Sequence, residues 1–302
     1  MSPGNPEPGT AGTDLHMHST ASDGALPPAE LVHRAAALGV SRLALTDHDT
    51  TAGVAEAVRA GEAAGVEVVA GVELSTLWCG REIHVVGLGM AHHPVFDQGL
   101  AYQQQQRWQR AEAIADRLHK RGLPGALQGV AGDGERAPGR SHFADWLVAQ
   151  GAVRDRPQAF KRYLGRQGSA WVRPAWVSLD TGVRWIRLAG GIAVLAHPFA
   201  YRMTGAWRRR LCTAFVEAGG EAVEVVTGRT TPVQVRDGIG LALRHGLLAS
   251  AGSDFHAPGT GLEPGRLLPL PDAVAPVSQL VRDHRDGGPG RAASGAPGIR
   301  PR

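Results

Sequence analysis

Short apolar runs alternate with amphipathic segments along most of the chain. Seven runs have the length and composition of β-strands, and several are almost continuously apolar, as expected for strands that are buried on both faces. These runs are Thr13–His18, Arg42–Thr46, Val66–Gly71, Ile83–Leu88, Ile192–Ala196, Ala222–Val226 and Leu247–Ala251.

Helix-type segments separate most of these strands. Pro27–Leu38 begins with a pair of prolines and stops before a glycine, and Thr51–Ala64 carries apolar residues at helical spacing and also stops before a glycine. Ala206–Ala218 and Val233–His245 have the same pattern. Because alternating strands and helices are typical of a parallel sheet, seven such units predict an α/β fold, a (β/α)7 TIM-like barrel.

One stretch interrupts the alternation. Residues 92–174 contain helical patterns but no convincing strand: Gln98–Arg121 predicts a long helix, His142–Gln150 a short one, and the glycine-rich Leu123–Gly139 a loop. We interpret the stretch as a small helical insertion domain that covers the mouth of the barrel. The barrel itself is then expected over residues 13–91 and 175–285.

The two ends of the chain carry no such pattern. Residues 1–12 are expected to be a flexible leader, and residues 286–302, rich in Gly, Pro, Ala and Arg, a disordered tail. The leader has no apolar stretch typical of a signal peptide, and no apolar run is long enough to cross a bilayer, so no membrane association is expected. With only two cysteines among 302 residues, a reducing cytoplasm is the simplest expectation.

Charge adds little to this picture. The chain carries 32 basic and 28 acidic residues, for a net charge of +4. A mildly basic surface suits an anionic ligand, but it does not by itself indicate a nucleic-acid partner.

Metal-ligating residue types fall at or just after the ends of five predicted strands and at the start of a sixth. In α/β barrels the active site is built at the C-terminal ends of the strands, so these side chains are expected to converge. His84 is the exception, because it lies at the start of its predicted strand. The candidate ligands are His16, His18, Asp23, His48, Glu73, His84, His197, Asp254 and His256.

Charge repulsion makes this cluster hard to explain without metal ions. Three carboxylates packed together would raise one another's pKa values, whereas divalent cations remove the repulsion. Nine ligands exceed the needs of one tetrahedral ion and suit two or three ions that share bridging carboxylates and activate a bridging water. A lone histidine or an Asp before Gly is usually structural, but six strand ends together favour the metal site. Asp14, Asp47 and Asp49 could orient the imidazoles or cap helices.

Five motifs in order resemble those of the PHP (polymerase and histidinol phosphatase) superfamily. They are Asp14–Gly24, Thr46–Asp49, Gly71–Ser75, Leu195–Pro198 and Gly252–His256. Within the superfamily the chain is most similar to the 3′,5′-nucleoside bisphosphate phosphatase and RNase AM group, through Arg140–Ala144 and Ser169–Val172 among other segments.

The resemblance implies a distorted seven-stranded barrel with a trinuclear metal site, usually manganese, and the nine ligands named above. A metal-bridging hydroxide would then be held by Asp23, His48, Glu73 and Asp254. Ligand chemistry alone suits manganese, iron or zinc equally well.

Arginines of the insertion are candidates for substrate binding. Arg107 and Arg110 share a helix face, and Arg140 and His142 lie near a helix start, so these four could bind a second phosphate or simply form a solvated basic surface. With the resemblance, we favour the phosphate role. Tryptophans also gather near the insertion, where one could stack on a base, although core packing is the better expectation for each; they are Trp108, Trp146, Trp171 and Trp176.

The sequence therefore predicts a phosphoesterase that hydrolyses the 3′-phosphoester of 5′-phosphorylated nucleotides. The substrate would be a 3′,5′-nucleoside bisphosphate such as pAp, a short 5′-phosphorylated RNA, or both. Two alternatives stay open: a histidinol-phosphate phosphatase and a non-catalytic metal-binding domain. The oligomeric state is not predicted.

Overall fold

The computed structural model describes residues 12–132 and 136–283. The expected leader, apart from its last residue, and the expected tail over residues 286–302 lie outside the described residues. No helix in the described part of the chain combines the length and apolar character that a bilayer crossing requires.

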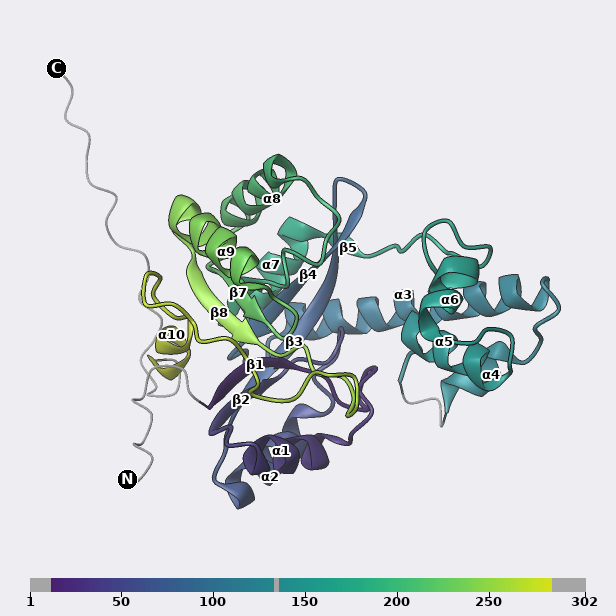
Figure 1. The fold of residues 1–302 in the computed structure, drawn as a ribbon, viewed down its shortest axis with the longest axis horizontal. Helices are drawn as coiled ribbons and strands as arrows, with labels where there is room; N and C mark the ends of the chain where they lie inside the picture. The colour runs from purple at the N-terminus through teal and green to yellow at the C-terminus, as the bar shows by residue number, and fades with distance from the viewer. Residues whose placement is uncertain (1–11, 133–135, 284–302) are drawn as a thin grey trace.

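An eight-stranded sheet curls into a nearly closed barrel (Figure 1). Seven strands follow one another in the order β1-β2-β3-β4-β6-β7-β8, and the short β5 pairs with β3. All seven predicted strands are present with shifted ends. The strands are β1 (Thr13–Met17), β2 (Arg42–Leu45), β3 (Glu67–Trp78), β4 (Arg81–Leu88), β5 (Val177–Ser178), β6 (Ile192–Leu195), β7 (Ala222–Thr227) and β8 (Leu248–Gly252).

The seam between the first and last strands is joined by backbone hydrogen bonds just past β8. The amide of Asp254 donates to the carbonyl of His16 at 2.9 Å, and the amide of His18 donates to the carbonyl of Phe255 at 2.9 Å. Met17 and Phe255 also form a parallel bridge. The residues that follow β8 are therefore held against the end of β1.

The expected all-parallel sheet is wrong at one strand. β4 runs antiparallel to both β3 and β6, while the other main pairings are parallel. The cause is local, because Cys79 and Gly80 both have positive φ, 46° and 69°, as in the tight turns that join hairpin strands. With only this turn between β3 and β4, no helix can bring the chain back for a parallel crossover.

Helices cover the outside of the barrel and bury its apolar faces. They are α1 (Pro28–Ala37), α2 (Val54–Ala64), α7 (Leu179–Leu188), α8 (Gly205–Glu217), α9 (Pro232–His245) and α10 (Ser278–Asp283). Their ends follow ordinary capping chemistry: Thr231 and Gln234 form a reciprocal capping box at the start of α9, and Gly246 ends it with φ of 65°.

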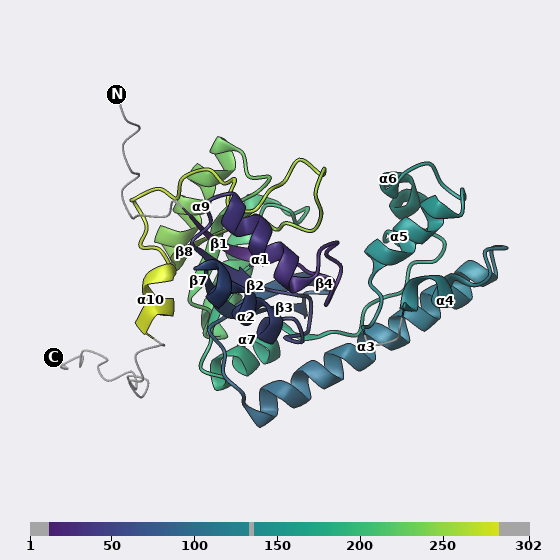
Figure 2. The ribbon, with the colours of Figure 1, turned by 90° about the horizontal axis from the view of Figure 1, so that it is seen from below.

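The segment between β4 and β5 is helical and has its own apolar core. It contains α3 (Pro94–His119), α4 (Ala126–Ala131), α5 (Arg140–Ala149), α6 (Arg156–Ala159) and the π-helix η1 (Phe160–Leu164). Ile114, Leu118, Phe143 and Leu147 are fully buried in this core. Figure 2 shows α3 running from beside the barrel out to α4, α5 and α6.

Two predictions in this segment need correction. The long helix begins four residues earlier than expected, because Pro94 occupies its first turn and the His93 side chain accepts the Val95 amide. The expected loop over residues 123–139 contains α4, which turns Val130 into the core described above. The glycines in and around this short helix are typical of a loop, so the sequence pattern did not indicate it.

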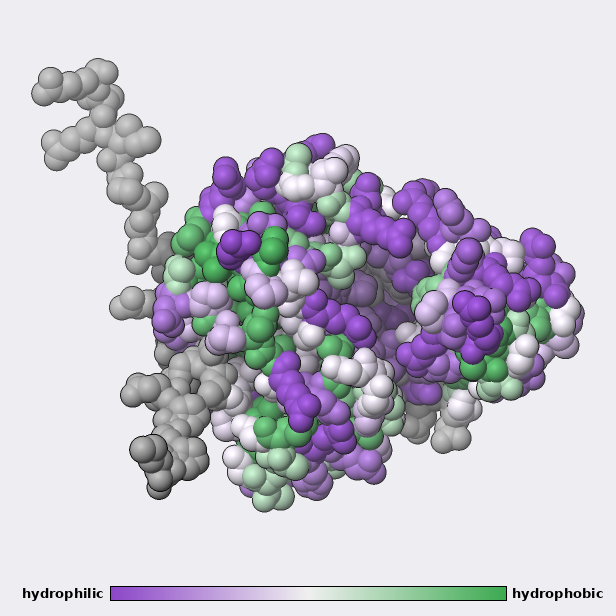
Figure 3. All heavy atoms as spheres, viewed as in Figure 1, coloured by the Kyte–Doolittle hydropathy of each residue, from purple (hydrophilic) through white to green (hydrophobic). Residues whose placement is uncertain are grey.

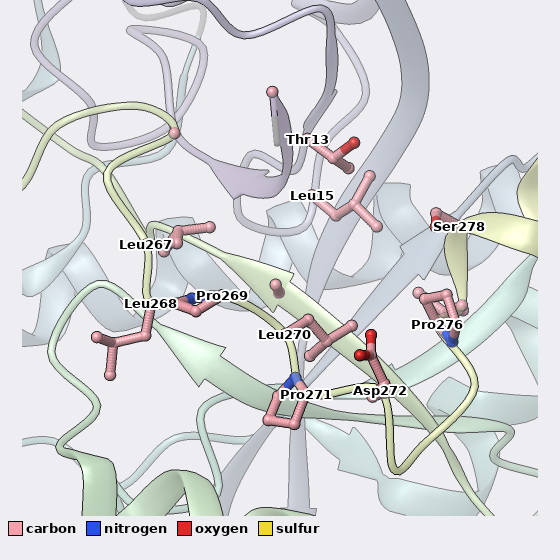
Figure 4. Close-up of a pocket in the computed structure, with 15 residues that line it drawn as sticks. Thr13, Leu15, Leu267, Leu268, Pro269, Leu270, Pro271, Asp272, Pro276 and Ser278 are labelled. Atoms are coloured by element: carbon pink, nitrogen blue, oxygen red, sulfur yellow. The ribbon is translucent and has the colours of Figure 1, made fainter. Parts of the chain in front are cut away.

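A cavity of about 660 Å³ lies near the N-terminal ends of β1 and β8, away from the predicted ligands. Figure 4 shows Leu15 of β1 facing it, with Leu267 and Leu270 of the segment after β8. Its lining is largely apolar and contains none of the predicted site residues.

Candidate metal centre

The nine predicted ligands lie together at one end of the barrel, with Glu73 at the centre. One carboxylate oxygen of Glu73, Oε1, lies 2.9 Å from Nδ1 of His84 and 2.8 Å from Nε2 of His197. The other oxygen, Oε2, lies 3.0 Å from Nδ1 of His48, 3.3 Å from Nε2 of His18 and 3.4 Å from Nε2 of His16. Five imidazoles from four strands or strand ends therefore face one buried carboxylate.

Two further carboxylates complete the cluster. Oδ1 of Asp23 lies 3.4 Å from Nε2 of His256, and Oδ1 of Asp254 lies 3.4 Å from Nε2 of His18. Among the described residues, the potential ligand atoms form three compact groups, each within 4.8 Å. The groups are His18, Asp23, His48 and His256; His16, His18 and Asp254; and His48, Glu73 and His84.

The direction of β4 explains why His84 lies at a strand start. Because β4 is antiparallel to β3, its first half lies beside the C-terminal half of β3, and His84 pairs with Ser75 in register. The early part of β4 is thus at the same end of the barrel as the C-terminal ends of the parallel strands. His84 therefore reaches the cluster from within a regularly paired strand.

Backbone strain is concentrated at this end of the barrel. Four non-glycine residues in the described ranges have positive φ, and three of them are Asp49, His197 and Asp254, at 53°, 27° and 54°. Such conformations cost about 1–3 kcal/mol each and persist where the surrounding structure enforces them. The strands therefore end in turns that aim side chains toward the cluster at a cost to local stability.

The electrostatics of the cluster keep its carboxylates ionised. Burial alone would raise the pKa of Glu73, but His84, His48 and His16 hold it well below its ordinary value. Burial would also raise the pKa of Asp23, but His48 and His256 hold it well below its ordinary value. Burial would lower the pKa of His18, but its contacts with Asp254 and Glu73 raise that pKa to about 10. The carboxylates thus offer full negative charge to whatever they bind.

The donor set fits divalent cations. Asp23 Oδ1, His48 Nδ1 and His197 Nδ1 are buried, and none of them makes a well-aligned hydrogen bond within the described residues, although Glu73 Oε2 lies 3.0 Å from His48 Nδ1 and His256 Nε2 lies 3.4 Å from Asp23 Oδ1. Buried polar atoms without partners are rare in folded proteins, and a bound ion is one of their ordinary explanations. Nitrogen and carboxylate oxygen donors together suit manganese, iron or zinc.

Glu224 of β7 is a site residue that the motif analysis missed. Its Oε1 lies 2.7 Å from Nδ1 of His16, and its Oε2 accepts the backbone N–H of His197 at 2.5 Å. It lies in the apolar run of β7 and is itself buried. A glutamate inside a buried strand was the available signal, because such a residue is rarely buried without a partner.

Asp14, Asp47 and Asp49 take neither of the roles left open for them. Within the described ranges, none of the three accepts a hydrogen bond from an imidazole ring or caps a helix. Asp14 accepts the amides of Ser253 and Gly265 at 2.8 Å each, and Asp47 accepts the hydroxyl of Ser22 at 2.6 Å. These aspartates hold the loops that carry the predicted ligands.

A pocket of about 110 Å³ joins the cluster to the helical insertion. Asp23, His48 and His84 line one side. Arginines of α3 and the start of α5 also line the pocket, among them Arg107, Arg110, Gly139, Arg140 and Ser141. Figure 3 shows the hydrophilic hollow between the barrel and the insertion.

The pocket arginines are held in place by acidic and aromatic neighbours. Arg107 donates to Asp49 at 2.6 Å and to the Ser75 hydroxyl at 2.9 Å. Arg110 and Arg140 each lie 3.1 Å from a Glu82 oxygen, and Arg110 Nε and Nη2 are buried without a hydrogen-bond partner. Burial would raise the pKa of Glu82, but Arg140 and Arg110 lower it to about 2.

The remaining candidates are divided between site and core. His142 lines a small pocket beside Asp23 and Arg107, accepts the Gly139 amide at 2.9 Å, and has a pKa that burial and Arg136 lower to about 4. Trp176 lies under both Arg107 and Arg110, 5.3 Å from each guanidinium. Of the other tryptophans, Trp146 packs against the insertion core and Trp171 lines a neighbouring cavity.

Comparisons with known proteins agree with this geometry. The PHP domain model matches residues 14–93. A 5′-3′ exoribonuclease of Haemophilus influenzae is 46% identical over 265 residues, covering 87% of this chain and 97% of its own length. A 3′,5′-nucleoside bisphosphate phosphatase of Chromobacterium violaceum is 41% identical over 271 residues, covering 88% and 95%.

Solved structures extend the likeness to the whole fold. An amidohydrolase from Chromobacterium violaceum, solved with bound sulfate, superposes with a TM-score of 0.86 at 40% identity and covers 91% of this chain and 97% of its own. A metal-dependent phosphoesterase from Bifidobacterium adolescentis has a TM-score of 0.78 at 27% identity, covering 94% and 99%.

The barrel and its histidine-rich cluster thus define a metal-dependent phosphoesterase. The chain belongs to the PHP family, and it is a hydrolase that acts on phosphoester bonds. The alternative of a non-catalytic domain is wrong, because relatives that match over nearly their whole length are hydrolases.

Proposed function

We propose that this enzyme hydrolyses the 3′-phosphoester of nucleotides that carry a 5′-phosphate. One observation carries the proposal: a single pocket is lined by Asp23, His48 and His84 on one side and by Arg107, Arg110 and Arg140 on the other. A substrate with two phosphates matches a site with two separate centres of phosphate recognition. The names of the relatives support the same substrates, nucleoside bisphosphates and RNA.

The 5′-phosphate would lie against the arginines. Guanidinium groups match phosphate oxygens in geometry, and two buried nitrogens of Arg110 are free to donate. Gly139, Arg140 and Ser141 form the start of α5, where the positive end of the helix dipole favours an anion. These groups orient the nucleotide so that its 3′-phosphorus faces the cluster.

The nine clustered side chains are proposed to hold two or three divalent ions, with manganese as the first candidate. Such ions lower the pKa of bound water and offset charge on the phosphate. In the reaction, a water oxygen bonds to phosphorus while the bond from phosphorus to O3′ breaks and O3′ takes a proton. A bisphosphate then gives a 5′-mononucleotide and phosphate, and an RNA gives a 5′-mononucleotide and a shortened chain that keeps a 5′-phosphate.

A histidinol-phosphate phosphatase is the weaker alternative. That substrate has one phosphate and gives three arginines beside the cluster nothing to bind.

The test is product analysis with pAp, a 5′-phosphorylated trinucleotide and histidinol phosphate, together with elemental analysis of the purified protein. Turnover of the first two substrates to 5′-mononucleotides, with at least two metal ions per chain, is the expected result. Preferential turnover of histidinol phosphate would overturn the proposal. A chain that neither retains nor takes up divalent ions would do so as well.

A further inference from the structure

A second cavity adjoins the pocket that faces the metal cluster. It has a volume of about 320 Å³ and shares Glu82 and Arg140 with that pocket. We call it the downstream cavity, and besides Glu82 its charged and aromatic lining consists of Arg81, Arg140, Arg166, Trp171, Arg173, Tyr201 and Arg202. The mechanism above uses only Arg140 from this lining.

Tyr201 connects the downstream cavity to the cluster. Its side chain lines the cavity, its hydroxyl accepts the backbone N–H of His84 at 2.8 Å, and its ring lies 5.3 Å from the ring of His197. The cavity and the cluster are therefore neighbours, with Tyr201 between them. A chain that continues beyond the reacting phosphorus has this space next to it.

The charge of the downstream cavity is strongly positive. Five arginines line it against one acidic residue, Glu82, whose carboxylate is already bound to Arg110, Arg140 and the Trp176 indole. Arg166, Arg173 and Arg202 are exposed, and in the described part of the chain none of them forms an ion pair. Arginines gathered around one cavity repel one another, and phosphodiester groups relieve that repulsion.

The cavity also offers a surface for a base. Trp171 is half-buried in its wall, beside the apolar side chains of Leu77, Pro174 and Met203. Stacking on an aromatic ring stabilises single-stranded bases with little dependence on sequence, and positive charge along the backbone is the usual companion of such a ring. A free phosphate ion has no apolar surface to place against this wall, whereas a nucleotide base has one, so the lining favours a nucleotide.

We propose that the downstream cavity binds the nucleotide on the 3′ side of the scissile phosphate of an RNA chain. The inference rests on the proposed function and deepens it, because a bisphosphate ends at its 3′-phosphate and never enters this cavity. The shortened RNA, which keeps the phosphorus as its new 5′-phosphate, remains bound there after the mononucleotide leaves. The site is thereby adapted to successive cleavage from the 5′ end.

The test compares two substrates on one double variant, Arg173→Ala with Arg202→Ala. For a 5′-phosphorylated trinucleotide, kcat/KM is expected to fall roughly 10- to 100-fold, and its dependence on salt to weaken, because two phosphate contacts are lost. For pAp, kcat/KM should change less than about twofold. Arg244→Ala, which removes an exposed arginine of α9, is the matched control for charge.

The outcomes separate the two proposals. If the wild-type enzyme hydrolyses pAp but not the trinucleotide, or if the variant loses both activities equally while keeping its wild-type melting temperature, the downstream subsite is overturned and the bisphosphate activity stands. If the wild-type enzyme hydrolyses neither substrate, the proposed function fails as well. Should the double variant not fold, the single variants Arg173→Ala and Arg202→Ala are compared in the same way, each expected to lose about tenfold on the trinucleotide alone.

Discussion

Nδ1 of His16 lies 2.7 Å from Oε1 of Glu224, and both side chains are buried inside the barrel. The other oxygen of the same carboxylate accepts the backbone N–H of His197. One glutamate therefore fixes the ring of one predicted metal ligand and the backbone of another. Carboxylates in this position orient imidazole ligands and raise their basicity.

Glu224→Gln is expected to weaken metal binding roughly 10- to 100-fold, because the amide keeps the shape of the side chain but loses its charge. Isothermal titration of the metal-free protein with Mn²⁺ measures the effect. Glu217→Gln, at an exposed position on α8, is the control and should bind like the wild type. An unchanged affinity in the Glu224 variant would separate this residue from the metal site.

His48→Ala should lower turnover by roughly 100-fold or more, because His48 belongs to two of the three ligand groups. The fold should survive, since the apolar cores of the barrel do not depend on this side chain. Steady-state kinetics and circular dichroism test both parts, with His33→Ala on the exposed face of α1 as control. Full activity in the His48 variant contradicts the proposed cluster.

Arg110→Ala should raise KM for pAp roughly 10- to 100-fold, the value of one or two hydrogen bonds to a charged phosphate. KM for an aryl phosphate that lacks a second phosphate should change less than about threefold. Arg121→Ala, beyond the end of α3 and exposed, serves as the control. Equal effects on both substrates would remove Arg110 from 5′-phosphate recognition.

Gly252→Ala should destabilise the fold by about 1–3 kcal/mol through overpacking. A Cβ atom at this position would meet Cβ of His16 at 2.3 Å and the His16 backbone nitrogen at 2.7 Å, so the end of β8 cannot stay in place. Gly240→Ala in α9, where the added atom meets nothing within 4 Å, should instead stabilise by about 0.5–1 kcal/mol. Urea unfolding of both variants and of the wild type measures these changes in the free energy of unfolding.

Much of the fold and the whole predicted cluster could be read from the sequence because both depend on local pattern. Buried strands are apolar runs, and most of the ligands lie at the end of a strand or within a few residues after it. The ligands His16 and His18 share one side of β1 through simple alternation. For the ligands on the parallel strands, convergence follows from the common direction of those strands, whereas His84 joins them through the antiparallel β4.

Other features depend on contacts between segments far apart in the chain. The reversed direction of β4 depends on a turn of two residues, Cys79 and Gly80. This pair is not a strong hairpin signal such as Asn-Gly. The bond between Glu224 and His16 joins residues 208 positions apart. The partners of Asp14 and Asp47 are likewise set by how the loops fold over the barrel, so spacing alone could not choose between their roles.

The continuity of α3 has a consequence for what the enzyme accepts. Gln103 attaches the helix to the barrel through Asp49 and the Ser75 carbonyl, and Arg110 stands seven residues further along the same rod. Each residue of a helix adds about 1.5 Å along the axis and 100° of rotation. The position of Arg110 relative to Gln103, and so relative to the barrel, is therefore fixed by the helix. Under the proposed function, the register of α3 therefore sets how far Arg110 lies from the cluster.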